Sequence, residues 1–135
     1  MEKTRRSNCP ISFSLDIIGD RWTLLILRDL VLTGKKHYQE LLEAGEDIAT
    51  NVLADRLQRL EQAGMITKRR DPHDGKRFLY AATEKGFDTL PIMLEMIVWG
   101  ARYDPKTAAP KAFVDRIHQN RGAVIAKYRK KIETG

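Results

Sequence analysis

Residues 48–83 constrain the fold more than any other part of the chain. Leucines at steps of four and three predict an amphipathic helix over residues 49–63, and Gly64 ends it. Residues 65–70 and 77–82 then predict two strands. The turn between the strands is indicated by Pro72, Asp74 and Gly75. We therefore expect a helix followed directly by a charged β-hairpin.

Three helices are predicted before this segment. Pro10 suits the first turn of a helix because it has no N–H group to leave unpaired, and Gly19 ends that helix. Residues 21–32 are apolar on most sides and predict the central helix of the core. Residues 37–44 predict a short third helix, and residues 35–36 before it are expected to form a short strand against the hairpin.

The C-terminal part of the chain is also predicted to be helical. Thr83 is expected to cap a long helix over residues 84–101, in which Pro91 either bends the helix or moves its start. Residues 104–110 have the composition of a linker. Apolar residues recur beyond this linker near helical spacing, which predicts one further helix.

The order of these elements is the plan of a winged helix-turn-helix. In this mainly α fold with a small β-hairpin (α+β), one helix can lie in a DNA groove and the hairpin, the wing, lies beside it. Residues 1–103 are expected to form this DNA-binding domain with its dimerisation helices, and residues 104–135 a linker and an additional basic C-terminal helix. The plan indicates a DNA-binding regulator rather than an enzyme.

The net positive charge lies outside the expected DNA-binding segment. The chain has a formal net charge of +6, but residues 1–101 contain 15 basic and 15 acidic residues, whereas residues 102–135 contain 9 basic and 3 acidic ones. Near the hairpin, local clustering is what counts, because residues 56–77 hold seven Lys or Arg against three Asp or Glu. Such a local surplus suits contacts with DNA phosphates.

Composition argues against several other classes of protein. The longest apolar run is far short of the ~18–20 residues of a membrane span, and the N-terminal residues do not resemble a secretory signal. Cys9 is the single cysteine, which rules out an internal disulfide and favours a cytoplasmic setting. His37, His73 and His118 fall on separate elements, and no Gly-rich phosphate loop is present. The candidate metal ligands at residues 71–75 are crowded into one tight turn, so we expect no metal site there. Because the histidines are scattered and no phosphate loop is present, we also expect no enzyme activity and no cofactor.

The helix over residues 49–63 offers a polar face suited to base reading. Asn51 can pair with adenine, and Arg59 can read guanine or hold a phosphate, each base pairing being worth about 1–3 kcal/mol of discrimination. Asp55 would repel phosphate unless it faces cytosine, pairs with a cation such as Arg59 or points away. The other candidates on this helix are Thr50, Ala54 and Gln58. The alternative is a solvated face with no DNA contact.

Lys76 and Arg77, next to the hairpin tip, are the strongest candidates for contact with the DNA backbone or minor groove. Alternation along a strand brings only some of the basic side chains to one outward face. The alternative is a charged edge hairpin that merely keeps the protein soluble. One helix and one wing cover too few base pairs for useful specificity, so we expect a twofold dimer on a pseudo-palindromic operator, with half-sites about 34–36 Å apart.

Several strings of residues resemble those of HxlR-type winged helix-turn-helix regulators, which are related to the MarR group. They are CPI at 9–11, IGDRWTLLILR at 18–28, VLADRLQRLE at 52–61, YAATEKG at 80–86 and WG at 99–100. The resemblance extends over residues 9–101. It departs at Ala49, where the family usually has Ser or Thr, so the cap of this helix is expected from Asp47 or Thr50.

The resemblance implies a cytoplasmic bacterial or archaeal homodimer that binds operator DNA. Its dimer contact would use the first and last helices of the family core. In this chain the corresponding candidates are Phe13, Ile17, Leu94, Ile97, Val98 and Trp99. Double-stranded DNA and a second copy of the chain are therefore the expected partners.

Cys9 is the candidate for a switch. It opens a helix, and Lys3, Arg5 and Arg6 lie near it in sequence; a helix N-terminus and positive neighbours both stabilise a thiolate. In several HxlR-type proteins a cysteine at this place senses oxidants or electrophiles, so the resemblance implies such an effector. The alternatives are a small apolar filler near the dimer contact, and a regulator that responds to a small ligand rather than through Cys9.

Two further alternatives stay open on the sequence. A winged helix can serve protein contact alone without specific DNA binding, although its recognition face would then expose apolar side chains. The C-terminal segment either packs as an extra dimerisation or docking helix, or forms a basic arm, residues 127–131, that touches DNA. Packing is favoured for the apolar stripe formed by Phe113, Ile117, Ile125 and Tyr128.

Overall fold

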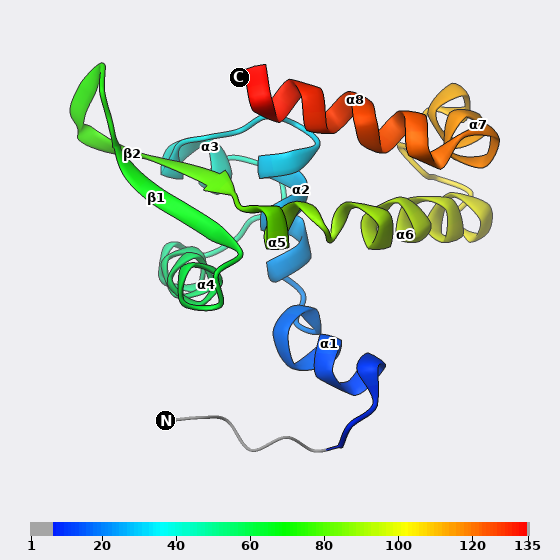
Figure 1. The fold of residues 1–135 in the computed structure, drawn as a ribbon, viewed down its shortest axis with the longest axis horizontal. Coiled ribbons are helices and arrows are strands. Elements are labelled where there is room, and N and C mark those ends of the chain that lie inside the picture. Colours follow the sequence, from blue (N-terminus) through cyan, green and yellow to red (C-terminus); the bar gives the residue numbers. More distant parts are fainter. Residues whose placement is uncertain (1–6, 135) are drawn as a thin grey trace.

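The computed structural model describes residues 7–134 (Figure 1). Within this range the chain is helical apart from a two-stranded antiparallel hairpin, which confirms the expected fold class. The elements are α1 (Pro10–Ile18), α2 (Thr23–Val31), α3 (Tyr38–Leu42), α4 (Thr50–Gln62), β1 (Ile66–Asp71), β2 (Asp74–Ala82), α5 (Glu84–Phe87), α6 (Leu90–Tyr103), α7 (Lys111–Gln119) and α8 (Arg121–Thr134). No described helix is long and apolar enough to cross a membrane, and no three His, Cys, Asp or Glu side chains in this range gather as metal ligands would.

The core is formed jointly by helices from both ends of the domain. Its most completely buried large side chains are Leu27, Leu53, Leu90, Leu94 and Ile117, which come from α2, α4, α6 and α7. Each such side chain stabilises the fold by about 1.5–3 kcal/mol through removal of apolar surface from water. The sequence identifies α2 as the central helix, and most of its residues are indeed buried.

The hairpin has a regular register that is anchored to the segment before α3. Pairs run from Ile66 with Ala82 at the base to Arg70 with Phe78, and an irregularity follows next to the turn. The strand expected at residues 35–36 is reduced to a single bridge one residue later, between His37 and Leu79. This bridge fixes the outer edge of the hairpin to the body of the domain.

The prediction of a single helix over residues 84–101 is wrong, because the chain forms the two helices α5 and α6 there. Thr83 caps α5 as predicted, since its hydroxyl oxygen accepts a hydrogen bond from the Gly86 amide at 3.2 Å. The Thr89 hydroxyl then donates to the Gly86 carbonyl at 2.7 Å, and Pro91 lies in the first turn of α6. Proline therefore moves the start of the helix, where its missing N–H leaves no bond unmade.

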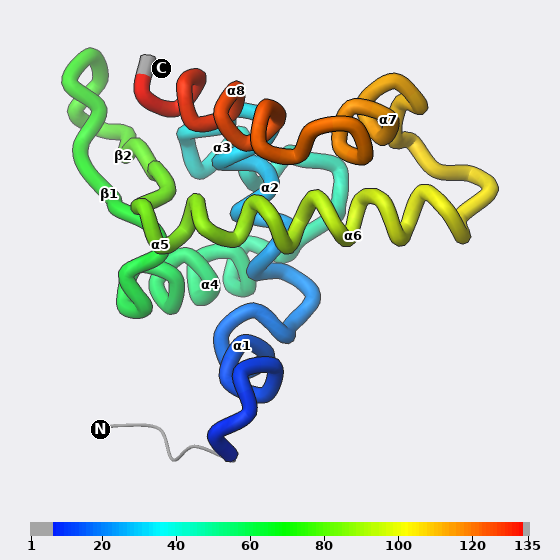
Figure 2. The backbone as a smooth tube through the Cα atoms, turned by 45° about the vertical axis from the view of Figure 1, so that its right-hand side comes forward, coloured from blue at the N-terminus to red at the C-terminus, as the bar shows by residue number. Residues whose placement is uncertain are grey.

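The C-terminal segment forms two helices rather than the one predicted. Asn120 ends α7, and its side-chain oxygen accepts a hydrogen bond from the Ala123 amide at 3.0 Å, as a cap of α8 does. Arg129 makes two hydrogen bonds of 2.8 Å to Glu84 and lies 4.4 Å from the centre of the Phe87 ring. α8 thereby runs back along α6 in the opposite direction (Figure 2), and the apolar stripe packs within the protomer.

α1 projects from this body (Figure 1). None of its nine residues is buried, and its exposed apolar side chains are Ile11, Phe13 and Leu15. An isolated helix of this length is only marginally stable in water. Ile17 and Ile18 pack against the core at the end of α1, whereas Ile11, Phe13 and Leu15 have about half or more of their surface exposed within the described part of the protomer.

Candidate nucleic-acid interface

α4 turns one face into the core and the other to solvent. Leu53, Leu57 and Leu60 are buried, as their spacing predicts. The exposed side contains the candidates Thr50, Asn51, Ala54, Gln58 and Arg59. The structure therefore brings the predicted helix residues together on one surface of hydrogen-bonding groups with one small side chain, which is the composition that major-groove reading requires.

α4 begins without a side-chain cap. Its N-cap residue is Ala49, so the cap expected from Asp47 or Thr50 is not formed. Tyr38 in α3 donates its hydroxyl hydrogen to the Thr50 carbonyl oxygen at 3.0 Å and so links α3 to the start of α4. The first amide groups of α4 remain for water or an anion, and a helix N-terminus favours phosphate.

A chain of ion pairs crosses α4. The Asp55 carboxylate lies 3.0 Å from Arg59 Nε and 2.5 Å from Arg56 Nη1, and Arg56 Nε lies 2.8 Å from the Asp20 carboxylate. Of the three arrangements expected for Asp55, the ion pair with Arg59 is the one formed. Arg56, which the sequence places only in the general basic cluster, is its second partner. We call Asp20, Arg56, Asp55 and Arg59 the ion-pair chain.

Asp20 anchors the ion-pair chain just before α2. Burial acts to raise the pKa of its carboxyl, but hydrogen bonds from the Thr23 hydroxyl, Arg56 and the Trp22 amide lower that pKa from 3.8 to about 2. Because the folded-state pKa is lowered, ionised Asp20 stabilises the fold fully above the unfolded-state value. This contribution is lost as the pH falls through about 2.

Two of the basic side chains on the hairpin make contacts within the hairpin itself. The exposed cations are Lys68, Arg69, Arg70, Lys76 and Arg77. Lys68 lies with its ammonium 4.4 Å from the centre of the Phe78 ring, and Arg70 donates a hydrogen bond to the Gly75 carbonyl at 2.6 Å. These two cations support the hairpin itself, since cation–π contacts and hydrogen bonds restrict their side chains.

Lys76 and Arg77 lie at the tip end of β2 with exposed side chains, where the sequence places the wing. Arg69 was not among the predicted site residues. It pairs with Leu79 across the hairpin, so its side chain leaves from the face opposite to that of Phe78. The direction of the Arg69 side chain follows from the alternation of side chains along a strand, which can be applied only when the pairing register is known.

His37 ties the hairpin to α3. One of its ring nitrogens lies 3.0 Å from the Asp71 carboxylate at the end of β1, and the other lies 2.8 Å from the Glu40 carboxylate. The hydrogen bond to Asp71, followed by that to Glu40, raises the pKa of His37. The wing consequently has a defined position relative to the helix-turn-helix.

A protein-family model matches the part of the chain that contains α4 and the hairpin. The HxlR-like helix-turn-helix family model matches residues 17–108, which include α2 to α6 and the hairpin. The chain belongs to the HxlR-like helix-turn-helix family. The resemblance drawn from the sequence strings is thereby confirmed, and the match ends before α7 and α8.

Relatives of this HxlR-like chain are transcriptional regulators. The HTH-type transcriptional regulator YdeP of Bacillus subtilis (strain 168) is 33% identical over 108 residues, which cover 77% of this chain and 84% of YdeP. The reduced form of the B. subtilis transcriptional regulator YodB has a TM-score of 0.59 at 29% identity, covering 75% of this chain and 99% of YodB. The oxidised redox regulator HypR has a TM-score of 0.60 at 31% identity, covering 70% and 96%. YodB has also been solved in quinone-bound and diamide-treated forms. The chain is a transcriptional regulator of the HTH type.

The HxlR-like protomer exposes large apolar side chains on α1 and α6. We call the set formed by Ile11, Phe13, Leu15, Ile92, Met96, Trp99 and Tyr103 the apolar surface. Of the residues predicted for a dimer contact, Phe13 and Trp99 belong to it, and Trp99 is 69% exposed. Ile17, Ile97 and Val98 are half-buried. The prediction that Leu94 takes part in the dimer contact is wrong, because Leu94 is 0% exposed within the core of its own protomer and cannot meet a partner.

Cys9 is an exposed free cysteine at the N-cap position of α1. Its amide donates a hydrogen bond to the Ser7 hydroxyl at 3.2 Å, and its side chain makes no cap bond. The basic neighbours Lys3, Arg5 and Arg6 lie outside the described residues. The thiol is thus accessible, and it lies at the outer end of the projecting helix that carries part of the apolar surface (Figure 1).

Proposed function

We propose that this HxlR-like regulator binds operator DNA as a homodimer, with α4 in the major groove and the hairpin along the flanking backbone. The observation that carries the proposal is the exposed polar face of α4 beside the cations of the hairpin. A winged helix used only for protein contact would expose apolar side chains at this face. Here they are exposed on α1 and α6 instead.

Base reading would use Asn51 and Arg59, with Thr50, Ala54 and Gln58 beside them. Arg59 is paired with Asp55 in the free protein, but its side chain is 66% exposed. An exposed ion pair of this kind is worth about 0.2–1 kcal/mol. A bidentate contact with guanine contributes about 1–3 kcal/mol of discrimination, so the base outcompetes Asp55. Asp55 then keeps Arg56 as its partner.

Replacing Lys76 and Arg77 together by Ala is expected to weaken binding to every duplex. Because these side chains would hold phosphates, the slope of log K against log salt should fall by about one for each phosphate that is no longer neutralised. Fluorescence anisotropy of a labelled random-sequence duplex, titrated between about 50 and 200 mM salt, measures both quantities.

Lys106→Ala/Lys111→Ala is the matched control for this wing variant. It removes the same two charges from positions outside the hairpin and α4 and should keep the slope of the unmodified protein. An unchanged slope in the wing variant would remove the hairpin from the interface. Binding of the unmodified protein that ignores salt would contradict DNA binding itself.

A dimer supplies the second recognition helix that specificity needs. The apolar surface supports this assembly, since large exposed apolar side chains on two elements mark an interaction site. Two copies of α4 one helical turn apart would read half-sites about 34–36 Å apart. Selection of bound duplexes from a random pool measures the symmetry and the spacing of the preferred sites.

We further propose that Cys9 makes the regulator responsive to oxidants or electrophiles. Its exposure at the start of α1 supports this, as do the redox regulator HypR and the quinone-bound form of YodB. The Cys9 thiolate would add to the ring of a quinone, which takes up one proton. Alternatively, two Cys9 thiols of a dimer would form a disulfide, giving two electrons and two protons to the oxidant.

Treatment with benzoquinone is expected to add one quinone mass to each chain and to change the affinity for operator DNA. Intact-protein mass spectrometry gives the first result and anisotropy the second. Cys9→Ser, which keeps the size of the side chain, should show neither change. An unmodified Cys9 with intact DNA binding after treatment would exclude this thiol as the sensor.

A further inference from the structure

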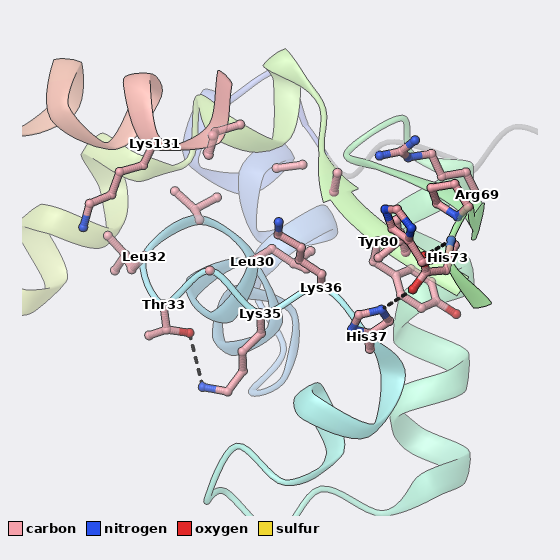
Figure 3. A pocket seen from close by; sticks show the side chains of 18 residues that line it. Leu30, Leu32, Thr33, Lys35, Lys36, His37, Arg69, His73, Tyr80 and Lys131 are labelled. Carbon is pink, nitrogen blue, oxygen red and sulfur yellow. Dashed lines mark hydrogen bonds and ion pairs between the residues drawn. The ribbon is translucent and has the colours of Figure 1, made fainter. Parts of the chain in front are cut away.

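The hairpin is held against the segment that leads into α3 by a backbone contact and by a side-chain contact. In the backbone contact, the Tyr80 amide donates a hydrogen bond to the Lys36 carbonyl oxygen at 2.8 Å. The side-chain contact lies at the end of β1, where the His37 ring is 3.0 Å from the Asp71 carboxylate. Figure 3 shows the His37 side chain pointing toward the hairpin. Of the two contacts, the second involves a group that titrates near neutral pH.

The His37 ring stands between two carboxylates. Its Nε2 atom lies 3.0 Å from Asp71, and its Nδ1 atom lies 2.8 Å from Glu40 in the first turn of α3. An ionised carboxylate only accepts hydrogen bonds, whereas a neutral imidazole has one donor and one acceptor. Both contacts can therefore be hydrogen bonds only while the ring carries two hydrogens and a positive charge. We call this pair of contacts the histidine clamp.

Backbone amides fix both carboxylates of the histidine clamp. Glu40 accepts hydrogen bonds from the Lys36 amide at 3.3 Å and from the His37 amide at 3.1 Å. Asp71 is buried and accepts one from the His73 amide at 2.8 Å. Turning either carboxylate away would break these bonds. When the ring loses its proton, one of its nitrogens is therefore left facing an acceptor, and one of the two contacts is lost.

Other charged groups face His37 from several elements. Arg77 on β2 acts against protonation of the ring, but the two carboxylates outweigh it, because the pKa of His37 is raised from 6.5. His37 lines a pocket between residues 30–37, the hairpin and the end of α8 (Figure 3). The other charged side chains and histidines that line it are Lys35, Lys36, Arg69, Asp71, His73 and Lys131. Lys131 lies with its ammonium 5.3 Å from the centre of the Tyr128 ring, and Lys35 lies 3.3 Å from the Thr33 hydroxyl.

The histidine clamp acts on the turn end of the hairpin, residues 71–77. Asp71 is the last residue of β1, and Lys76 and Arg77 lie across the turn from it on β2. Loss of the contact with Asp71 would leave the hairpin attached through the Tyr80 amide. The turn end would then be held by the pairing of the two strands alone.

We propose that His37 is a proton-dependent positioning residue of the wing, whose charged ring holds the turn end of the hairpin against α3. The consequence for DNA rests on the proposed function, in which Lys76 and Arg77 hold phosphates. Because the folded-state pKa of His37 is raised, the clamp is complete below the unfolded-state value of about 6.5 and is lost as the pH rises through the folded-state value. The affinity for DNA therefore falls with rising pH.

An NMR titration of the full chain between about pH 5 and pH 9 tests the clamp without DNA. The His37 ring signal, assigned by its absence from the His37→Gln variant, should have a midpoint above 6.5. The amide signals of Asp71, Gly75 and Arg77 should shift with the same midpoint, and the variant should lack this transition. A midpoint at or below 6.5, or hairpin amides that do not follow the ring, would overturn the proposal.

Fluorescence anisotropy with a random-sequence duplex tests the consequence for DNA. From about pH 6 to about pH 9, the unmodified protein should lose about three- to tenfold more affinity than His37→Gln does. His37→Arg keeps its charge and its donors at every pH, so it should lose no more affinity than His37→Gln. Equal losses for the unmodified protein and His37→Gln would overturn the proposal. Absence of DNA binding at every pH would contradict the proposed function alone, and the ring titration would still decide the clamp.

His73→Gln is the matched control, because it removes the neighbouring titratable ring in the turn and should leave the pH dependence unchanged. Should His37→Gln fail to unfold cooperatively, Asp71→Asn takes its place. Asparagine lacks the charge but retains an oxygen that can accept the hydrogen bond from the His73 amide. The His37 midpoint must then fall, and an unchanged midpoint would refute the clamp. In that case the His37 signal is the one that remains in both His73→Gln and His118→Gln.

Discussion

Met96→Lys/Trp99→Asp is expected to yield a monomer that binds operator DNA about 100-fold more weakly or worse. Both side chains belong to the apolar surface and are more than half exposed in the protomer, so the substitutions leave the core intact. Burial of two charges in an apolar contact costs more than such a contact supplies. Loss of the second half-site then removes the effective concentration that linkage provides. Sedimentation velocity measures the mass, and anisotropy measures the affinity.

Ala112→Asp/Ala126→Lys is the control for the dimer variant. It places one acidic and one basic residue at exposed positions of α7 and α8 and should leave both mass and affinity unchanged. A Met96/Trp99 variant that remains dimeric, with a normal circular dichroism spectrum, would show that the apolar surface is not the dimer contact. A folded monomer with full affinity would instead contradict the need for two half-sites.

Gly86→Ala is expected to destabilise the protein by about 3 kcal/mol. A Cβ atom on Gly86 would lie 2.0 Å from the Met65 carbonyl oxygen and 3.1 Å from its carbon. That oxygen already accepts a hydrogen bond from the Thr83 amide at 3.0 Å, so a shift of either backbone segment would break this bond. The base of the hairpin and α5 would therefore separate. Urea denaturation measures the free energy of unfolding.

Gly122→Ala serves as the comparison for the Gly86 variant. A Cβ atom at Gly122 meets only the Asn120 side-chain oxygen, at an ordinary 3.5 Å, in the first turn of α8. We expect it to stabilise the fold by up to about 1 kcal/mol, because it lowers the entropy of the unfolded chain. A Gly86 variant within about 0.5 kcal/mol of the unmodified protein would show that the close approach can relax.

Local patterns were sufficient for the buried face of α4 and for the hairpin. The spacing of Leu53, Leu57 and Leu60 determines which face of α4 is buried, because residues three or four positions apart lie on the same face of a helix. The expected turn is present, but it consists of Pro72 and His73, and the predicted turn residues Asp74 and Gly75 already belong to β2. The cap at Thr83 follows from short-range hydrogen bonding, which neighbouring residues encode. Such features need no knowledge of the tertiary fold.

Features that depend on distant segments could not be found in this way. Leu94 belongs to the same apolar stripe of α6 as Trp99, and only the packing of the other helices decides that one is buried and the other exposed. The bond between Asp20 and Arg56 joins positions 36 residues apart. Asn120 is an exception, because an asparagine before a helical run is a local cap signal that predicts the break between α7 and α8.

The ion-pair chain connects the segment that follows α1 to the exposed face of α4. Asp20 follows α1 after a single glycine, and it holds Arg56, whose link through Asp55 ends at Arg59. Stretching any of these links by about 1 Å would break its hydrogen bond, and the exposed link between Asp55 and Arg59 is worth only about 0.2–1 kcal/mol. A contact that draws Arg59 away from Asp55 would thus break the chain at its most exposed pair and leave Asp20, Arg56 and Asp55 joined.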